Sequence, residues 1–243
     1  MRRNKEFVFM AAIVCLSVLL VIFAVSRLSE SVPVITSAKP FNQIVLDAGH
    51  GGIDAGATGV NRALEKNINL SITIALRDML IIGGYDAVLT RDKDESKHDP
   101  SITKIPRYKK SDLRNRLKII TNNPNSITVS IHQNKYPSPS ERGAQIFYSD
   151  NNPLSLQLAQ RIQDEFAAKL QPWNDRKIKP DKGAYFLLKE TKTPIVLAEC
   201  GFLSNYKEAA LLSTEDYQHR TAFTLFCAIV KFMEDHNATE TSL

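Results

Sequence analysis

The chain has 243 residues, of which 43% are hydrophobic and 23% charged, and its formal net charge is +5 at pH 7. This length suits one domain with a sizeable hydrophobic core and one short additional segment. The sequence has three cysteines and no long basic run, which argues against a disulfide scaffold and against a nucleic-acid-binding protein.

The N-terminus has the pattern of a membrane or export segment. A basic start precedes an uncharged run from Phe7 to Val25, close to the roughly 20 residues that a helix needs to cross a bilayer. The basic flank predicts that the N-terminus stays inside and the domain lies outside the cytoplasm. We expect residues 1–26 to be a retained membrane anchor, with a cleaved signal segment as the alternative. A linker (27–42), one folded domain (43–236) and a short tail (237–243) follow.

Strand-like and helix-like patterns alternate along this domain. Strands separated by helices predict a single α/β domain with a mainly parallel, twisted sheet covered by helices on both faces, preceded by one N-terminal hydrophobic helix. In chain order, the predicted elements are strand Gln43–Asp47, helix Glu65–Ile82, strand Asp86–Arg91, helix Asp112–Asn122 with Ser111 as its cap, strands Ser126–His132 and Ala144–Ser149, helix Pro153–Leu170, strands Tyr185–Leu188 and Pro194–Glu199, and helix Glu215–His236.

Metal-seeking or acidic side chains lie at or just after the ends of three predicted strands. They are His50, His132 and Glu199, and in parallel sheets the active groups gather beyond these ends. Glu65 begins the first helix. Two histidines and one glutamate are the ligands of a catalytic zinc site with an open fourth position. The second glutamate is then free to act as a base, so the set predicts a zinc hydrolase.

Each of these residues also has an ordinary interpretation when taken alone. His132 could be a structural histidine at a strand end, and His50 a turn residue in a glycine-rich loop. Glu65 could be an acid favoured by the dipole at a helix start. Glu199 is the least ordinary of them, because burying a carboxylate beside an apolar strand is costly without a partner or a task. The joint placement favours the functional interpretation.

From about Gln43 to about Asp235, the chain resembles the zinc-dependent N-acetylmuramoyl-L-alanine amidases of the Amidase_3 family. One departure is Ala48, where many family members have proline. The matching motifs are Leu46–Ala57, Glu65 with Asn69–Leu70, Leu89–Asp92, Leu113 with Arg116, Ser130–Asn134, Gly143 with Tyr148, and Glu199–Asn205.

The resemblance implies both a reaction and the residues that carry it. The substrate would be peptidoglycan, cleaved at the amide between the lactyl group of N-acetylmuramic acid and L-alanine. One Zn2+ per chain would be held by His50, Glu65 and His132, and Glu199 would be the catalytic carboxylate. Substrate binding is expected from Asn134, Arg91 and Arg116.

The lengths of two segments indicate which members of this family the chain resembles most. Lys135–Gly143 is too short for the blocking helix that some family members insert there, so we expect an open groove. Lys93–Lys110 is a long, basic loop. The overall layout is similar to the germination-specific CwlD-type amidases of endospore formers. That similarity implies a role in forming muramic-δ-lactam in spore cortex. The enzyme would act at the extracytoplasmic face of the membrane or in the wall, and an accessory or activating protein is a candidate partner.

Two other functions and one feature of the cysteines stay open. The chain could be a zinc peptidase that cuts within the stem peptide, or a non-catalytic, membrane-tethered wall-binding protein. Cys200 and Cys227 could pair, but we expect two small buried hydrophobic residues.

Overall fold

The structure is a computed structural model that describes residues 41–102 and 104–237. The predicted anchor, most of the linker and the tail lie outside these residues. No helix within the described ranges combines the length and apolar character needed to cross a bilayer. The elements are β1 (Gln43–Ala48), α2 (Glu65–Ile82), β2 (Ala87–Leu89), α3 (Ile105–Ile120), β3 (Ser126–Asn134), β4 (Gln145–Tyr148), α4 (Pro153–Glu165), the π-helical turn η1 (Phe166–Leu170), β5 (Lys179–Pro180), α5 (Phe186–Glu190), β6 (Ile195–Phe202), α6 (Tyr206–Leu212) and α7 (Glu215–Asn237).

The six strands form one sheet in the order β2-β1-β3-β6-β4-β5. The first four run parallel, β4 is antiparallel to β6, and β5 is parallel to β4. This arrangement confirms the predicted mainly parallel sheet. The register places Asp47 beside Ser130, and Glu199 between His132 and Gln145.

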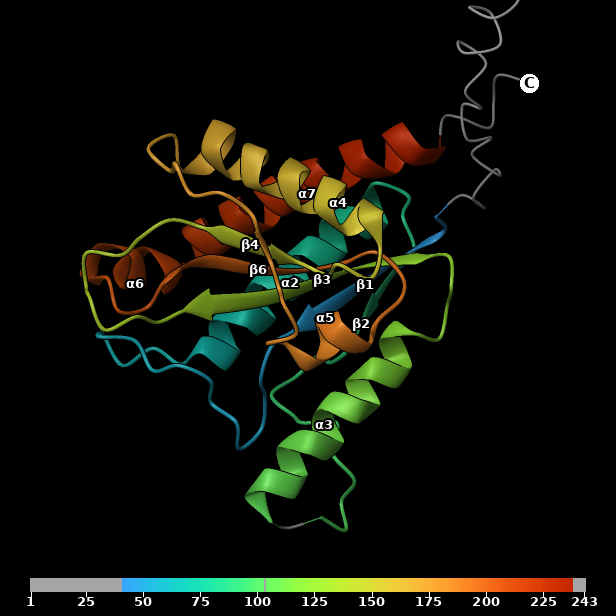
Figure 1. The fold of residues 1–243 in the computed structure, drawn as a ribbon. Coiled ribbons are helices and arrows are strands. Elements are labelled where there is room, and N and C mark those ends of the chain that lie inside the picture. The colour runs from blue at the N-terminus through green and yellow to red at the C-terminus, as the bar shows by residue number, and fades with distance from the viewer. Residues whose placement is uncertain (1–40, 103, 238–243) are drawn as a thin grey trace, which may run out of the picture. The chain divides into compact units, whose positions relative to one another are not determined.

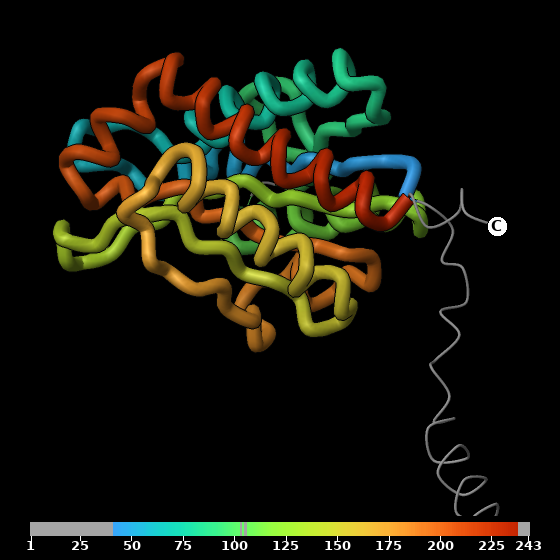
Figure 2. Tube along the Cα trace, turned by 90° about the horizontal axis from the view of Figure 1, so that it is seen from above, coloured from blue at the N-terminus to red at the C-terminus, as the bar shows by residue number. Residues whose placement is uncertain are grey.

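Helices cover both faces of the sheet (Figure 1). On one face, α2, α4 and α7 bury a large apolar core with alternate residues of the strands, such as Ile44, Leu46 and Ile131. Seen from above, these three helices lie across that face (Figure 2). On the opposite face, α3 and α5 cover a smaller cluster around Val45 and Leu197. Because side chains alternate along a strand, neighbouring residues belong to different faces.

Helix α3 begins earlier than predicted. It starts at Ile105 with Pro106 in its first turn, where proline is well tolerated because that amide has no helical partner. Part of the predicted basic loop is therefore helical. Ser111 lies inside α3 and is not its cap; its Oγ accepts a hydrogen bond from the backbone of Asp99.

The predicted strand at Tyr185–Leu188 is wrong, since this segment forms α5. A short apolar run has too few residues for its periodicity to separate a strand from a helix. Two short elements, β5 and α6, were not predicted. The stretch 135–144 between β3 and β4 has no helix, in agreement with the prediction for that connection.

Candidate metal centre and active site

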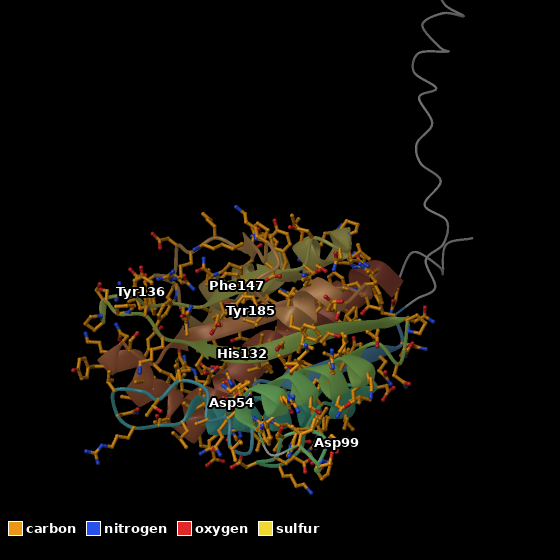
Figure 3. The ribbon with its side chains drawn as sticks, turned by 60° about the horizontal axis from the view of Figure 1, so that its bottom comes forward. Asp54, Asp99, His132, Tyr136, Phe147 and Tyr185 are labelled. Atoms are coloured by element: carbon orange, nitrogen blue, oxygen red, sulfur yellow. The ribbon has the colours of Figure 1, made fainter. Side chains whose placement is uncertain are left out.

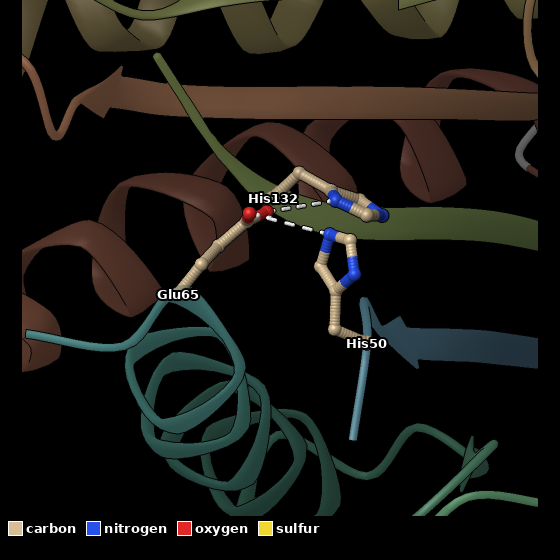
Figure 4. Close-up of side chains that lie close together, drawn as sticks. All are labelled: His50, Glu65 and His132. Carbon is tan, nitrogen blue, oxygen red and sulfur yellow. Dashed lines mark hydrogen bonds and ion pairs between the residues drawn. The ribbon is translucent and has the colours of Figure 1, made fainter. Parts of the chain in front are cut away.

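Three residues from distant parts of the chain converge at the carboxyl ends of the central strands. His50 follows β1, Glu65 is the first residue of α2, and His132 lies in β3. One nitrogen or carboxylate oxygen from each lies within 4.8 Å of the others. Figure 4 shows the Glu65 carboxylate directed at one nitrogen of each imidazole ring. The structure therefore brings together all three predicted metal ligands.

The Glu65 carboxylate is fully engaged. Its Oε2 lies 3.2 Å from Nε2 of His50, and its Oε1 lies 3.0 Å from Nδ1 of His132. The backbone amides of Ala57 and Gln133 also donate to it, at 2.7 and 3.1 Å. Burial alone would raise the pKa of Glu65, but the two histidines hold it well below its usual range. This carboxylate is ionised, as a metal ligand must be.

Asp54 orients the His50 ring and had no predicted role. Its Oδ2 lies 3.0 Å from Nδ1 of His50, which leaves Nε2 directed at the cluster. Burial lowers the pKa of His50, yet the hydrogen bonds with Asp54 and Glu65 raise it to about 9. A carboxylate on the outer nitrogen of a ligand histidine fixes its tautomer and increases its basicity. The available signal was an acid four residues after the histidine in the same glycine-rich loop.

Two glycines allow the ligands to approach one another. A Cβ on Gly49 would lie 2.3 Å from the His132 ring. One on Gly56, which has a φ of +68°, would lie 2.5 Å from Oε2 of Glu65. His50 itself has a φ of 63°, an uncommon conformation that often occurs at functional sites. The glycine-rich motif is therefore needed for the geometry of the cluster.

Asn69, in α2, stabilises the cluster through hydrogen bonds of its side chain. Its buried amide nitrogen donates to the carbonyl of Gly49 at 3.2 Å and to Oε1 of Glu65 at 3.3 Å. Its oxygen accepts from Nε2 of Gln133, also at 3.2 Å. One side chain thus connects the loop after β1, the start of α2 and the end of β3. The sequence motif contained Asn69, but its function depends on contacts that only the fold reveals.

Glu199 lies beside the cluster on β6, as the register partner of His132. It is 7% exposed, and its Oε2 is buried without a hydrogen-bond partner among the described residues. Burial raises the pKa of Glu199 to about 7. A carboxyl group with such a pKa can both accept and donate a proton near neutral pH. Burial and the charge of Glu199 also raise the pKa of Tyr185 to about 12, so this hydroxyl stays protonated.

Arg91 and Arg116 are buried below the cluster, and their substrate-binding role stays a prediction. Both are 1% exposed. Arg91 donates to the carbonyls of Ala48 and Gly49. Arg116 donates to Ala48 and to the carboxylate of Asp47, at 2.8 Å from Oδ1. The two guanidinium groups hold the loop that carries His50, and Arg116 also borders the pocket beside the histidines.

Asn134 lies at the end of β3 and is partly exposed. Its proposed contact with substrate stays a prediction. A pocket of about 270 Å³ opens beside the histidines, between the loop after β1 and helices α3 and α5. Figure 3 looks toward this side of the sheet and shows Asp54 and His132. The pocket is lined by Asp47, Gly49, His50, Asp54, Tyr108, Lys109, Asp112, Leu113, Arg116, His132 and Leu187.

The donor set fits a zinc ion. Two imidazoles and one carboxylate are the ligands of a zinc site that keeps a position for substrate, and the unpartnered oxygen of Glu199 lies on the same face. Both described cysteines are free, with Cys200 buried. The chemistry that the arrangement can support is metal-assisted hydrolysis with a carboxylate as proton carrier.

Comparisons with known proteins agree with this site. The family model described as N-acetylmuramoyl-L-alanine amidase (Amidase_3) matches residues 44–231. The germination-specific N-acetylmuramoyl-L-alanine amidase of Bacillus subtilis (strain 168) is 36% identical over 192 residues, which cover 79% of this chain and 80% of the relative.

Solved structures give the same result. The CwlD amidase from Clostridioides difficile, in complex with the GerS lipoprotein, has a TM-score of 0.76 and 39% identity. The match covers 80% of this chain and 99% of that one. The catalytic domain of CwlV, an N-acetylmuramoyl-L-alanine amidase from Bacillus (Paenibacillus) polymyxa var. colistinus, has a TM-score of 0.65 and 30% identity, with coverages of 79% and 98%.

Proposed function

Because the chain belongs to the Amidase_3 family of N-acetylmuramoyl-L-alanine amidases, we propose that it cleaves peptidoglycan with one zinc ion held by His50, Glu65 and His132. The bond is the amide between the lactyl group of N-acetylmuramic acid and L-alanine. The single observation that carries the metal proposal is the convergence of these three donors within 4.8 Å.

The residues around the ligands prepare them for a metal. Asp54 holds His50 through Nδ1, and Asn69 holds the Glu65 carboxylate. A zinc ion bound there would supply Lewis acidity, which polarises a carbonyl and makes water more acidic. Ligands fixed in place by outer hydrogen bonds need not reorganise when the ion binds.

Glu199 performs the proton transfers in this proposal. As a carboxylate it accepts a proton from the attacking water, and as an acid it donates that proton to the departing nitrogen of L-alanine. Both steps require a pKa near the working pH, and burial raises the pKa of Glu199 to about 7. The proton taken from water thus ends on the amine, and the hydroxide ends on the lactyl carbonyl carbon.

We further propose that the enzyme acts outside the cytoplasm, in spore-cortex maturation needed for germination. The support is its 36% identity to the germination-specific amidase of B. subtilis. An accessory protein is part of the proposal, because the 39% identical CwlD of C. difficile was solved in complex with the GerS lipoprotein. Attachment through residues 1–26 stays a prediction.

The test is digestion of peptidoglycan sacculi by the purified full-length protein, with products read by mass spectrometry. We expect stem peptides that begin with L-alanine, together with peptide-free muramic acid. A chelator should abolish their release, and added zinc should restore it. Cuts within the stem would contradict the amidase proposal in favour of a peptidase. Release that is unaffected by the chelator would contradict the metal proposal.

A further inference from the structure

A basic edge of the sheet faces the same side as the metal cluster. Lys179 begins β5, and Lys177 lies two residues before it. Ile178 packs against the large core under α2, α4 and α7. Because side chains alternate along extended backbone, Lys177 and Lys179 point to the opposite face. That face also carries His132 and Glu199.

The register connects these lysines to the catalytic strand. Glu199 is paired with Gln145 across β6 and β4, and Nε2 of Gln145 donates to the carbonyl of Lys177 at 2.9 Å. Lys179 is paired with Phe147 on β4, whose ring contacts that of Tyr185. Figure 3 labels Tyr185, Phe147 and His132 in the view onto this side, and β6 lies between the strands of Phe147 and His132. Neighbouring strands lie about 5 Å apart, so Lys177 lies about 10 Å from Glu199 along the sheet.

The amino groups of the two lysines are available for a ligand. Both residues are exposed, and within the described residues neither amino group forms a hydrogen bond or ion pair. The neighbouring Arg176 differs, because it is paired with Glu141 and donates to the carbonyl of Arg142. Asp175 is an exposed acid on this segment, whereas Asp181 is buried and accepts hydrogen bonds from the backbone.

The chemistry of the two sides of the cluster is different. On the α3 side, the pocket of about 270 Å³ suits a compact group, and the cations in its wall are already paired with carboxylates, Lys109 with Asp54 and Arg116 with Asp47. On the β5 side, the surface is an open edge with two unpaired cations. A stem peptide carries carboxylates on the residues after L-alanine, and extended chain advances about 3.5 Å per residue. Carboxylates two or three residues beyond the cleaved amide therefore reach the lysines.

We propose that Lys177 and Lys179 form a subsite for the carboxylates of the stem peptide, an inference that rests on the proposed amidase function. The flexible ammonium groups are suited to carboxylates in variable positions. The subsite orients the substrate so that the peptide crosses β6 and β4 and the muramoyl group lies toward the α3 pocket. It also makes the enzyme selective for stems whose carboxylates are free over stems in which they are amidated.

The test compares two substrates that differ only in this charge. The double variant Lys177→Gln, Lys179→Gln should lose about three- to tenfold in kcat/KM on muropeptides with free carboxylates, mainly through KM, as expected for exposed ion pairs. On the amidated muropeptides it should match the wild type. Added salt should weaken the wild type on the acidic substrate alone. Lys192→Gln is the matched control, because Lys192 is an exposed lysine before the amino end of β6.

Equal losses on both substrates, or no loss on either, would overturn the subsite. Binding measurements separate this result from a failure of the proposed function. The stem peptide and its amidated form are titrated into the Glu199→Gln variant with and without the two lysine substitutions. We expect the lysine changes to weaken binding of the acidic peptide only. Wild-type enzyme that releases no peptide beginning with L-alanine would instead contradict the amidase function, whatever the binding data show.

Discussion

The two faces of the sheet differ in composition although they are built from the same strands. Toward α2, α4 and α7, the strands present residues such as Ile131 and Ala198, both fully buried in the large core. Toward α3 and α5, the next residues along the chain are His132 and Glu199. The alternation of a strand thus places the hydrophobic core and the reactive groups one residue apart.

This difference separates the origin of stability from the origin of activity. The large face buries apolar surface, which is the main favourable contribution to folding. The reactive face instead buries some groups that are unfavourable for folding, including an oxygen of Glu199 that has no hydrogen-bond partner among the described residues. Proteins accept such groups at active sites because activity needs them. Replacing Glu199 and truncating a core residue should therefore have opposite consequences.

The largest expected effect is the loss of activity in Glu199→Gln. Glutamine has nearly the same shape but cannot carry the proton, so the rate should fall about 10²- to 10⁴-fold. Zinc content should stay near one ion per chain, because Glu199 is not among the three clustered donors. Rates on sacculi and metal analysis of the same sample provide the measurement. A variant that loses zinc would show that Glu199 is a ligand.

The same substitution should increase stability in the metal-free protein. Burial raises the pKa of Glu199 to about 7, above its value in the unfolded chain. At higher pH, ionisation of Glu199 therefore lowers the free energy of unfolding. Glutamine removes this cost, and urea unfolding at pH 8 should show a higher free energy of unfolding. A lower value would mean that the Glu199 carboxylate stabilises the fold.

On the core face, Ile131→Ala should reduce stability and leave the chemistry intact. Ile131 is fully buried, and truncating such a side chain costs about 2–5 kcal/mol in the free energy of unfolding. The rate per folded molecule should stay close to that of the wild type. Thr128→Val is the matched control on the other face of the same strand, because Oγ1 of Thr128 is buried and has no hydrogen-bond partner in the part of the chain that the structure describes. It should be neutral or stabilising, and a loss as large as that of Ile131→Ala would contradict the comparison.

Most strands of the sheet were predicted well from the sequence, whereas one of the helices that cover the reactive face was not. The apolar runs and the acids or histidines at their ends were enough to predict the parallel sheet and the residues that converge at the site. Most of these signals are local, lying within a few residues of a strand, and Glu65 lies instead at the start of a helix. The short segment that forms α5 was assigned wrongly, because propensity alone cannot separate a strand from a helix in so short a run.

The hydrogen bonds that hold the metal ligands in place could not be predicted from the sequence. Arg91 and Arg116 lie in motifs near the site and were assigned to substrate, yet both point inward to backbone carbonyls. Asn69 contacts three segments that are distant in sequence. An arginine or an asparagine has the same residue type whether it faces a ligand or a carbonyl, so only the packed structure distinguishes these roles.

The smallest expected effect is the pH dependence contributed by Asp47, the buried acid that pairs with Arg116 below the site. Burial alone would raise the pKa of Asp47, but Arg116, together with hydrogen bonds from Ser130 and Thr90, lowers it to about 2. A lowered pKa stabilises the folded state above the unfolded value of 3.8, and this contribution is lost as the pH falls toward 2. The expected loss is about 2 kcal/mol.

Urea unfolding of the wild type and of Asp47→Asn between pH 6 and pH 2 measures this contribution. At pH 6 the variant should be the less stable protein by about 3–5 kcal/mol, because Arg116 keeps its buried charge without this partner. Toward pH 2 the difference should shrink by about 2 kcal/mol, since the wild-type carboxylate becomes protonated. A constant difference across this range would mean that Asp47 is not the titrating group. The acid sensitivity of the reactive face would then have to come from its other carboxylates.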